Sequence, residues 1–298
     1  MKTTRKQPIL TAGGQTNPSL LAFMLTLIII FAVSSEHVLA QRFSDTEGNF
    51  AEMEIYMLLA KGIINGDGTN FFPGKPVTRA EFAKMLVTAL GYEDDAGEIE
   101  NYPAAFSDIE GHWAAGFVKE AWELGIAKGE GTRFYPDRSI NRAELLTMLL
   151  RAFRVAVESD AEKNRQMLEK FGDWTNIPSW AVPYVARAVE KGIVEGTPEG
   201  LFEPLRRASR AEAAKVLAAV AAQNGYIYDY LGFLTVAGGK SGQIHLSING
   251  TTAVFPLSRD TVAYEGRKKV NVKDLNGKKV YIVIKDEKVA FIKEAGEE

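Results

Sequence analysis

The chain repeats one ordered set of motifs three times, and this repetition constrains its fold more than any other feature. Each copy opens on Phe-x-Asp and closes on a tetrapeptide that ends in Arg-Ala-Glu. The pairs are Phe43–Asp45 with Thr78–Glu81, Phe106–Asp108 with Asn141–Glu144, and Phe171–Asp173 with Ser209–Glu212. Between these ends, every copy has an apolar segment, Gly-Ile, a second glycine and Phe-x-Pro. Because a repeated unit of this size seldom buries its apolar face alone, we expect the three copies to stack around a common core.

Each copy is predicted to contain two helices. Apolar residues recur at spacings of three and four after Phe-x-Asp, as in Ile55, Leu58 and Leu59, which is typical of one buried helix face. The glycine of Gly-Ile, Gly62 in the first copy, stands where this helix should end, a position that often needs a left-handed backbone. The proline of Phe-x-Pro then favours an extended entry into the second helix.

The closing tetrapeptide predicts the start of the second helix. Its first side chain, Thr78 in the first copy, carries an oxygen, and Glu81 follows three residues later, as in a capping box. The arginines Arg79, Arg142 and Arg210 are not explained by capping. At an exposed site, the helix dipole disfavours a cation in the first turn by about 0.3–1 kcal/mol, and an exposed arginine should contribute little to stability.

Two hypotheses explain the repeated arginine. A helix start with a guanidinium is suited to bind a carboxylate or phosphate. Alternatively, each arginine pairs with a nearby acidic residue, such as Asp45, Asp108 or Asp173, and ties the copies together. Residue chemistry alone leaves both readings open.

With all these motifs in order, residues 43 to 220 resemble a triplet of S-layer homology domains. The resemblance implies a pseudo-threefold spindle with a three-helix bundle core and helical prongs. It also implies that grooves between the prongs bind secondary cell-wall polysaccharide, typically through an acidic pyruvyl ketal. The residues that it suggests as ligand contacts are Arg79, Arg142, Arg210, Trp113, Trp180, Asp45, Asp108 and Asp173.

The family signature includes an aromatic residue followed by alanine, and this aromatic residue is tryptophan in only two of the three copies. It is Trp113-Ala114 and Trp180-Ala181, whereas the first copy has Phe50-Ala51. Tryptophan can stack on a sugar and donate a hydrogen bond, which phenylalanine cannot, although an aromatic residue at a helix start is also often part of the core. For the three aspartates, we favour a role as helix caps or turn formers over a role as ligands.

Residues 226–298 change to a strand pattern. Ile244, Leu246 and Ile248 alternate with polar residues, and Asn249-Gly250 is a tight-turn signal that also fits a glycosylation sequon with Thr251. We predict a separate, small antiparallel β-barrel or meander, which makes the whole chain α+β. This domain could be a spacer, a contact for neighbouring subunits or a second carbohydrate-binding module.

The first 40 residues have the pattern of a signal peptide. Basic residues precede a 14-residue apolar run, Leu20–Val33, and Val38–Ala40 offers a cleavage site. The run is shorter than the roughly 20 residues of a spanning helix, so a retained anchor is the weaker alternative and no membrane span is expected after cleavage. The predicted order is a signal peptide (1–40), repeat 1 (41–92), an acidic linker (93–105), repeat 2 (106–155), a linker (156–170), repeat 3 (171–222) and the β domain (226–298).

Composition argues against several functions. The chain has no cysteine, which excludes disulfides and thiolate chemistry, and its formal charge changes from −3 to −5 without residues 1–40, so nucleic acid is not an expected partner. After residue 40 the only histidines are His112 and His245, and we find no catalytic triad or cofactor motif. Asn65–Gly68 resembles a calcium loop, but Pro76 stands where the bidentate glutamate is required. The acidic stretch from Glu93 is better explained as a solvated linker, so no metal site is predicted.

We therefore expect a secreted, non-catalytic protein of the cell wall or S-layer that binds secondary cell-wall polysaccharide or peptidoglycan and displays its β domain outward. Other cell-surface proteins are further candidate partners. The alternatives are a lattice subunit of the S-layer, a tether between outer membrane and peptidoglycan, and an accessory chain of a wall-attached enzyme. The tether is the weaker reading because such proteins carry a large membrane barrel.

Overall fold

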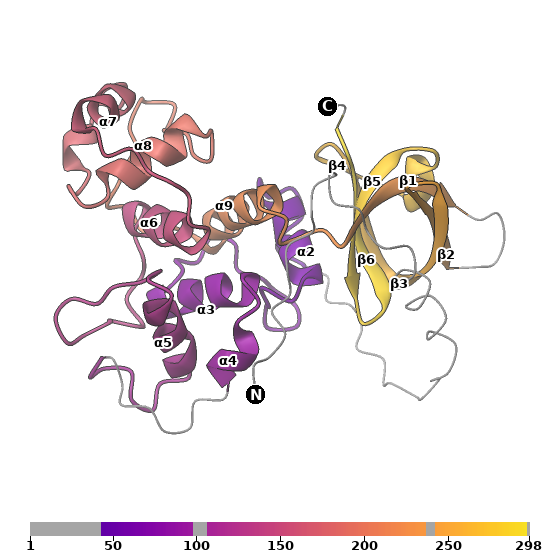
Figure 1. Cartoon of the computed structure of the whole chain (residues 1–298), viewed down its shortest axis with the longest axis horizontal. Coiled ribbons are helices and arrows are strands. Elements are labelled where there is room, and N and C mark those ends of the chain that lie inside the picture. Colours follow the sequence, from indigo (N-terminus) through magenta and orange to yellow (C-terminus); the bar gives the residue numbers. More distant parts are fainter. Residues whose placement is uncertain (1–42, 98–105, 237–241, 297–298) are drawn as a thin grey trace.

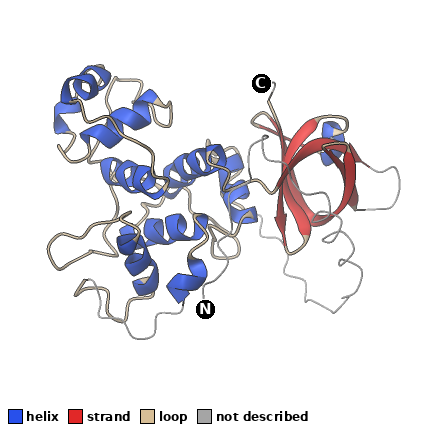
Figure 2. Ribbon diagram, in the orientation of Figure 1, coloured by secondary structure: helices blue, strands red, loops and turns tan. Residues whose placement is uncertain are grey.

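A computed structural model describes residues 43–97, 106–236 and 242–296. The predicted signal peptide lies outside these residues. The described chain forms a helical part and a β-barrel that lie side by side (Figure 1), and Figure 2 shows that helices and strands are segregated between them. The α+β prediction is confirmed.

Each repeat supplies the predicted pair of helices. The pairs are α2 (Glu52–Ala60) with α3 (Arg79–Ala89), α5 (Ala115–Glu123) with α6 (Arg142–Ala152), and α8 (Val182–Glu190) with α9 (Arg210–Gln223). All three second helices begin with a complete capping box, formed by Thr78 and Glu81 in α3 and by the equivalent residues in α6 and α9. The predicted helix starts are therefore confirmed.

Two segments that we predicted to be linkers contain helices. Residues of the acidic segment form α4 (Glu93–Gly97), and the second segment contains α7 (Ala161–Leu168), which is followed by the 3-10 turn η1 (Trp174–Asn176). The carbonyl of Ala96 lies so close to Gly116 of α5 that a side chain there would clash, and Leu168 of α7 is fully buried. Each of these helices carries an apolar residue that packs on the neighbouring repeat, and this contact explains the difference from a solvated linker.

The three repeats contact one another in a closed cycle. The second helix of each repeat packs on the first helix of the next, in the pairs α3 with α5, α6 with α8 and α9 with α2. The extended residues before the second helices also form a ring of backbone hydrogen bonds. In this ring Val77 N donates to Ala208 O (3.0 Å), Ala208 N to Ile140 O (2.9 Å) and Ile140 N to Val77 O (3.0 Å). Such a ring needs all three copies, so the repeats form one unit.

The recurring phenylalanines and the second glycine have one structural explanation. The ring of Phe-x-Asp lies against the ring of Phe-x-Pro, with centroids 5.5 Å apart for Phe106 and Phe134, and the other two copies are the same within 0.1 Å. Gly129 lies under the Phe106 ring and beside the Arg133 carbonyl, with no room for a Cβ atom. This close approach accounts for a glycine at the same place in every repeat.

The C-terminal part is a closed barrel. Its elements are β1 (Tyr230–Val236), β2 (Gln243–Ile248), β3 (Thr251–Glu265), β4 (Lys268–Val270), the 3-10 turn η2 (Val272–Leu275), β5 (Lys279–Lys285) and β6 (Lys288–Glu294). The strand order is β2-β1-β5-β6-β3-β4, and pairing of β2 with β3 closes the sheet. Asn249 and Gly250 both have positive φ, as predicted for their tight turn.

The prediction of an antiparallel barrel is wrong for one pair of strands, because β3 and β6 are parallel. The long β3 pairs with β2 over its first half and with β6 over its second, and β4, η2 and β5 then return the chain across the barrel. A closed order β1-β2-β3-β6-β5 with this one parallel pair is the connectivity of the OB-fold.

The barrel packs directly against the helical part. Tyr264, Val283 and Phe291 on its outer surface belong to the same apolar core as the helical part, and β5 and β6 contact α2. At this interface the carboxylate of Glu54, which is 6% exposed, accepts two hydrogen bonds from Arg267, of 2.7 and 2.9 Å. The barrel therefore has a fixed place beside repeat 1.

Candidate functional site: the junctions between repeats

Each of the three repeated arginines reaches into the next repeat. Arg79 of repeat 1 donates from Nε to Phe134 O (2.9 Å), from Nη2 to Lys128 O (2.9 Å) and from Nη1 to Glu144 Oε1 (3.1 Å). Its guanidinium also lies over the Phe134 ring, 4.7 Å from the centroid. The Phe-x-Pro loop of repeat 2 and the capping glutamate of repeat 2 together form this seat.

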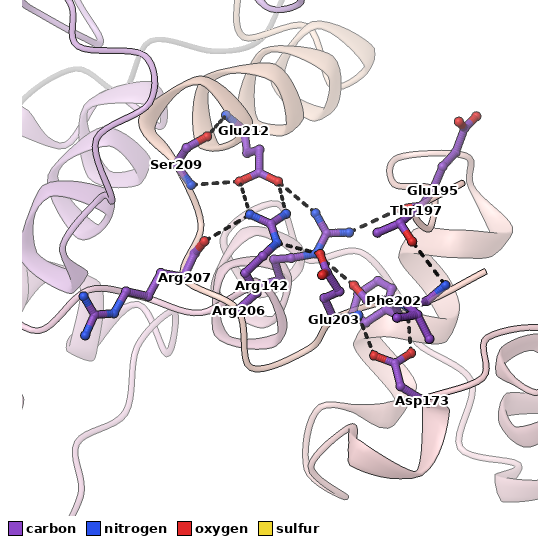
Figure 3. A network of polar contacts seen from close by, with 11 residues as sticks. Arg142, Asp173, Glu195, Thr197, Phe202, Glu203, Arg206, Arg207, Ser209 and Glu212 are labelled. Carbon is purple, nitrogen blue, oxygen red and sulfur yellow. Dashed lines mark hydrogen bonds and ion pairs between the residues drawn. The ribbon is translucent and has the colours of Figure 1, made fainter. Parts of the chain in front are cut away.

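Repeat 2 makes the same contacts to repeat 3 (Figure 3). Arg142 donates to Phe202 O (3.0 Å), Glu195 O (3.2 Å) and Glu212 Oε1 (3.0 Å). In the same view the Glu212 carboxylate also binds Arg206 and the amide of Ser209. One glutamate thus caps its own helix and holds the arginine of the preceding repeat.

Repeat 3 completes the cycle with weaker contacts to repeat 1. Arg210 donates to Phe71 O (2.9 Å) and Asn65 O (3.0 Å), but its Nη1 is 3.6 Å from Glu81 Oε1, which is an ion pair without a hydrogen bond. Each repeated arginine thus pairs with an acidic residue and ties two repeats together, as one hypothesis stated. The acid is the capping glutamate of the next repeat in place of the aspartates given as examples, although the charge of Asp45 also acts on Arg210. The expectation of an exposed arginine was wrong, because Arg79 is only 5% exposed.

Burial governs the electrostatics of these seats. It lowers the pKa of the Arg79 guanidinium, and the charge of Glu144 opposes this effect; burial likewise lowers the pKa of Arg142 and of Arg210. Burial raises the pKa of Glu212, but hydrogen bonds from Arg206 and from the Ser209 amide outweigh it, so the pKa lies below its ordinary value. Arginine stays charged in proteins, so the seats are charged pairs at neutral pH.

The three junctions differ in a second cation. Arg138 and Arg206, each four residues before the motif arginine, donate two hydrogen bonds to Glu144 and Glu212, respectively. Repeat 1 has Lys75 at the equivalent position, and Arg210 is the only ion-pair partner of Glu81 among the described residues. Sequence analysis missed Arg138 and Arg206, although a comparison of the copies position by position would have shown a cation there in all three.

The three aspartates organise the loop that supplies the seats. Asp108 accepts hydrogen bonds from Phe134 N (2.8 Å) and Tyr135 N (2.7 Å), and Tyr135 has a φ of 58°. Asp45 and Asp173 bind the equivalent pairs of amides in their repeats. Burial raises the pKa of Asp108, but the two amides outweigh it and the pKa is lowered. Their contacts are those of the turn-forming role that we favoured.

The aromatic-Ala pairs place an aromatic ring at the surface in every repeat. Phe50, Trp113 and Trp180 are 52%, 57% and 48% exposed. The alanine that follows each of them is fully buried, so it anchors the turn while the ring stays outside the core. The alternative that these rings are core residues is therefore wrong.

Contacts through His112 connect the Trp113 ring to the neighbourhood of an arginine seat. His112 contacts the Trp113 ring, and its Nε2 lies 3.2 Å from Asp137. Its Nδ1 accepts a hydrogen bond from Ala114 N. The residue after Asp137 is Arg138, whose side chain shares Glu144 with Arg79. At the junction of repeats 3 and 1, Lys215 of α9 lies 5.5 Å from the Phe50 ring centroid.

Comparison with known proteins agrees with this geometry. The model of the S-layer homology domain matches residues 42–83, 105–146 and 170–214, which run from the opening phenylalanine of each copy into its second helix. The chain contains three S-layer homology domains. Each domain ends just after the arginine that reaches into the next one, except that Arg210 of the third returns to the first.

Several curated proteins share this region. Over 187 residues the chain is 34% identical to an amylopullulanase of Thermoanaerobacterium thermosulfurigenes, which covers 62% of this chain and 10% of that protein. It is 31% identical to S-layer protein sap and 30% identical to S-layer protein EA1, both of Bacillus anthracis, over 57% and 76% of this chain and 20% and 25% of theirs. The chain thus spans a quarter or less of the length of these relatives. The S-layer homology domains and the S-layer relatives confirm the predicted place at the cell surface, with an anchoring role.

Within the three described ranges, no helix combines the length and apolar character that crossing a membrane requires.

Proposed function

We propose that the S-layer homology domains anchor the protein by binding a secondary cell-wall polysaccharide at the junctions between repeats. The observation that carries this proposal is the exposed aromatic ring at the same place in every repeat, Phe50, Trp113 and Trp180. A large apolar side chain that is about half exposed in all three copies is not needed by the core. Aromatic rings with a polar edge suit the alternating apolar and hydroxyl surfaces of a sugar.

The repeated arginines supply guanidinium groups at the junctions between repeats. The side chain of Arg210 is 15% exposed and uses two of its five N–H groups in hydrogen bonds to the protein, which leaves N–H groups for an acidic group such as a pyruvyl ketal. We propose that Arg79, Arg142 and Arg210 both lock the repeats together and attract the acidic polymer, with Trp113 and Trp180 as stacking residues. Asp45, Asp108 and Asp173 act indirectly in this scheme, because they hold the loops.

The proposal includes no catalysis. His112 is occupied by Asp137 and Ala114, and His245 lies on the barrel, apart from the junctions. We infer that the repeats form the pseudo-threefold spindle that the family implies, which the closed cycle of contacts supports. Partners other than the wall polymer, including peptidoglycan itself, are outcomes of the test below.

The test is cosedimentation of the protein with cell-wall sacculi, before and after chemical removal of their secondary polymer. The variant is Trp113→Ala with Trp180→Ala, which changes two exposed rings and should leave the fold intact. The matched control is Trp122→Ala, because Trp122 is also 48% exposed but lies on the other end of α5.

We expect both polymer removal and the double variant to abolish cosedimentation, whereas the control binds normally. Binding that survives polymer removal would assign the repeats to peptidoglycan. Binding that is lost equally in the double variant and in Trp122→Ala would refute a specific role of the aromatic-Ala pairs.

A further inference from the structure

Two exposed apolar side chains of the barrel lie on the same wall. Phe233 of β1 and Val254 of β3 are 56% and 51% exposed, whereas the exposed Tyr230 of β1 contacts Phe255 and lies on the other face of its strand. The opposite side of the barrel, formed by β5 and β6, packs against α2. Figure 1 shows the same arrangement, with β6 toward α2 and β2 on the far side. The β1–β2–β3 wall therefore faces away from the anchoring domains.

The strand register defines a continuous surface on this wall. Phe233 pairs with Ser247, and Ser247 pairs with Thr252. Paired residues in neighbouring strands have Cβ atoms about 4.5–5.5 Å apart, so these three side chains form one row.

A second row lies two residues along each strand. It consists of Thr235, His245 and Val254, which are paired in the same way. The residues between the rows, Leu234 and Leu246, are fully buried in the barrel. Because side chains alternate across a strand, both rows point outward, and we call these six residues the outer wall.

The chemistry of the outer wall favours one class of ligand. It offers one aromatic ring, one aliphatic side chain, three hydroxyl groups and one imidazole, with no carboxylate, ammonium or guanidinium group. Lys279, which pairs with Phe233 on the β5 side, lies at its margin. An acidic polymer or a nucleic acid strand would need several cations. A sugar without charge presents apolar C–H faces and hydroxyl groups, which match a ring surrounded by hydroxyls.

We propose that the outer wall binds a neutral oligosaccharide, so that the protein has a second carbohydrate site independent of the S-layer homology domains. Phe233 supplies the stacking surface, and Thr235, Ser247, Thr252 and His245 supply hydrogen bonds. The connectivity of the barrel agrees with this site, since OB-folds bind oligosaccharides and oligonucleotides on the face of their second and third strands. The fold is an analogy here, and the residues carry the proposal.

The test is isothermal titration calorimetry of the full chain with cellohexaose, maltohexaose and chitohexaose, each titrated to millimolar concentration. The variants are Phe233→Ala, which removes the stacking surface, and Thr252→Lys, which places a charge on the wall. The control is Leu205→Ala, since Leu205 is 61% exposed but lies in the helical part. All three positions are exposed, so thermal melts should show that the variants fold.

We expect at least one hexaose to bind. Both wall variants should raise its Kd about tenfold or more, which corresponds to about 1.4 kcal/mol, while the control should bind with the Kd of the wild type. The proposal is overturned if no hexaose binds or if the wall variants bind as well as the control. The variant with Trp113→Ala and Trp180→Ala separates the two sites, because it should lose sacculi and keep the hexaose. If that variant lost hexaose binding, the sugar would bind to the repeats, and the proposal would be overturned. It would also be overturned if sedimentation velocity showed a dimer of the wild type and a monomer of Phe233→Ala, because the outer wall would then bind a second copy of the chain.

Discussion

Replacement of Arg79 by methionine tests whether the repeated arginine holds the domains together. Methionine keeps much of the apolar stem and removes the guanidinium. The change therefore deletes two hydrogen bonds to loop carbonyls, Phe134 O and Lys128 O, and one to the carboxylate of Glu144. It also deletes the cation over the Phe134 ring.

The size of the effect follows from burial. Arg79 and Glu144 are 5% and 8% exposed, and removal of one partner of a buried ion pair costs about 3–5 kcal/mol. Arg138 still pairs with Glu144 after the change, which lowers this cost. The two carbonyls lose charge-assisted hydrogen bonds, which adds to it. We therefore expect the free energy of unfolding to fall by about 3–5 kcal/mol, and at about 2–4 °C per kcal/mol for a chain of this size the Tm should fall by about 6–20 °C.

The assay is thermal and urea unfolding of the variant beside Arg207→Met. Arg207 is an exposed arginine close to the seat of Arg142, so its loss should change the Tm little. Arg210→Met should lie between the two, because Arg210 makes only two hydrogen bonds and a 3.6 Å ion pair. If Arg79→Met and Arg207→Met melted within a degree of each other, the seat would contribute nothing and the reasoning from burial would be refuted.

Three further changes test other parts of the fold. Arg267→Ala leaves the buried carboxylate of Glu54 without its partner, so it should cost about 1–3 kcal/mol and make the link between barrel and repeats sensitive to limited proteolysis; an unchanged digestion pattern would contradict a fixed interface. The pKa of Glu212 is lower in the folded chain than in the unfolded chain, so its stabilisation is present above the ordinary glutamate pKa and is lost as the pH falls through the folded value. Glu212→Gln should therefore be less stable than the wild type at neutral pH but lose less Tm on acidification, and parallel curves of Tm against pH would count against this. Gly129→Ala forces a Cβ atom into the Phe106 ring and a backbone carbonyl and should lower the Tm by several degrees, whereas an unchanged Tm would show that the loop can relax.

The sequence was sufficient for features that depend on neighbouring residues. Helix starts were predicted correctly because a capping box is a contact within four residues, as between Thr78 and Glu81. The turn at Asn249-Gly250 was predicted for the same reason. The repeats themselves were found because the motifs recur in order.

Features that depend on contacts between repeats or domains were not predicted. Arg79 is buried by a loop about 50 residues away in the sequence. Its position in the first turn of a helix did not reveal this contact and suggested an exposed side chain. The parallel pairing of β3 and β6 depends on how the barrel closes. The alternation of apolar and polar residues along a strand does not reveal it, because that alternation is the same for parallel and antiparallel pairing. The docking of the barrel depends on Glu54, a residue that looks like an ordinary exposed helix position in the sequence.

The three junctions are alike in backbone and different in charge, and this difference limits how far one repeat can substitute for another. Glu144 and Glu212 are each held by two arginines, so each of these junctions places two guanidinium groups around one capping carboxylate. Arg210 instead lies 3.6 Å from Glu81, and the charge of Asp45 also acts on it. The aromatic-Ala pair of repeat 1 has Phe50 in place of tryptophan, and Arg267 of the barrel is bound to the Phe50 carbonyl. The junction of repeats 3 and 1 thus has a single guanidinium group beside its capping glutamate, a weaker stacking residue and a neighbour from another domain. A cycle of three repeats that is closed by backbone hydrogen bonds can tolerate this divergence, because the ring at Val77, Ile140 and Ala208 fixes the geometry of every seat without its side chains.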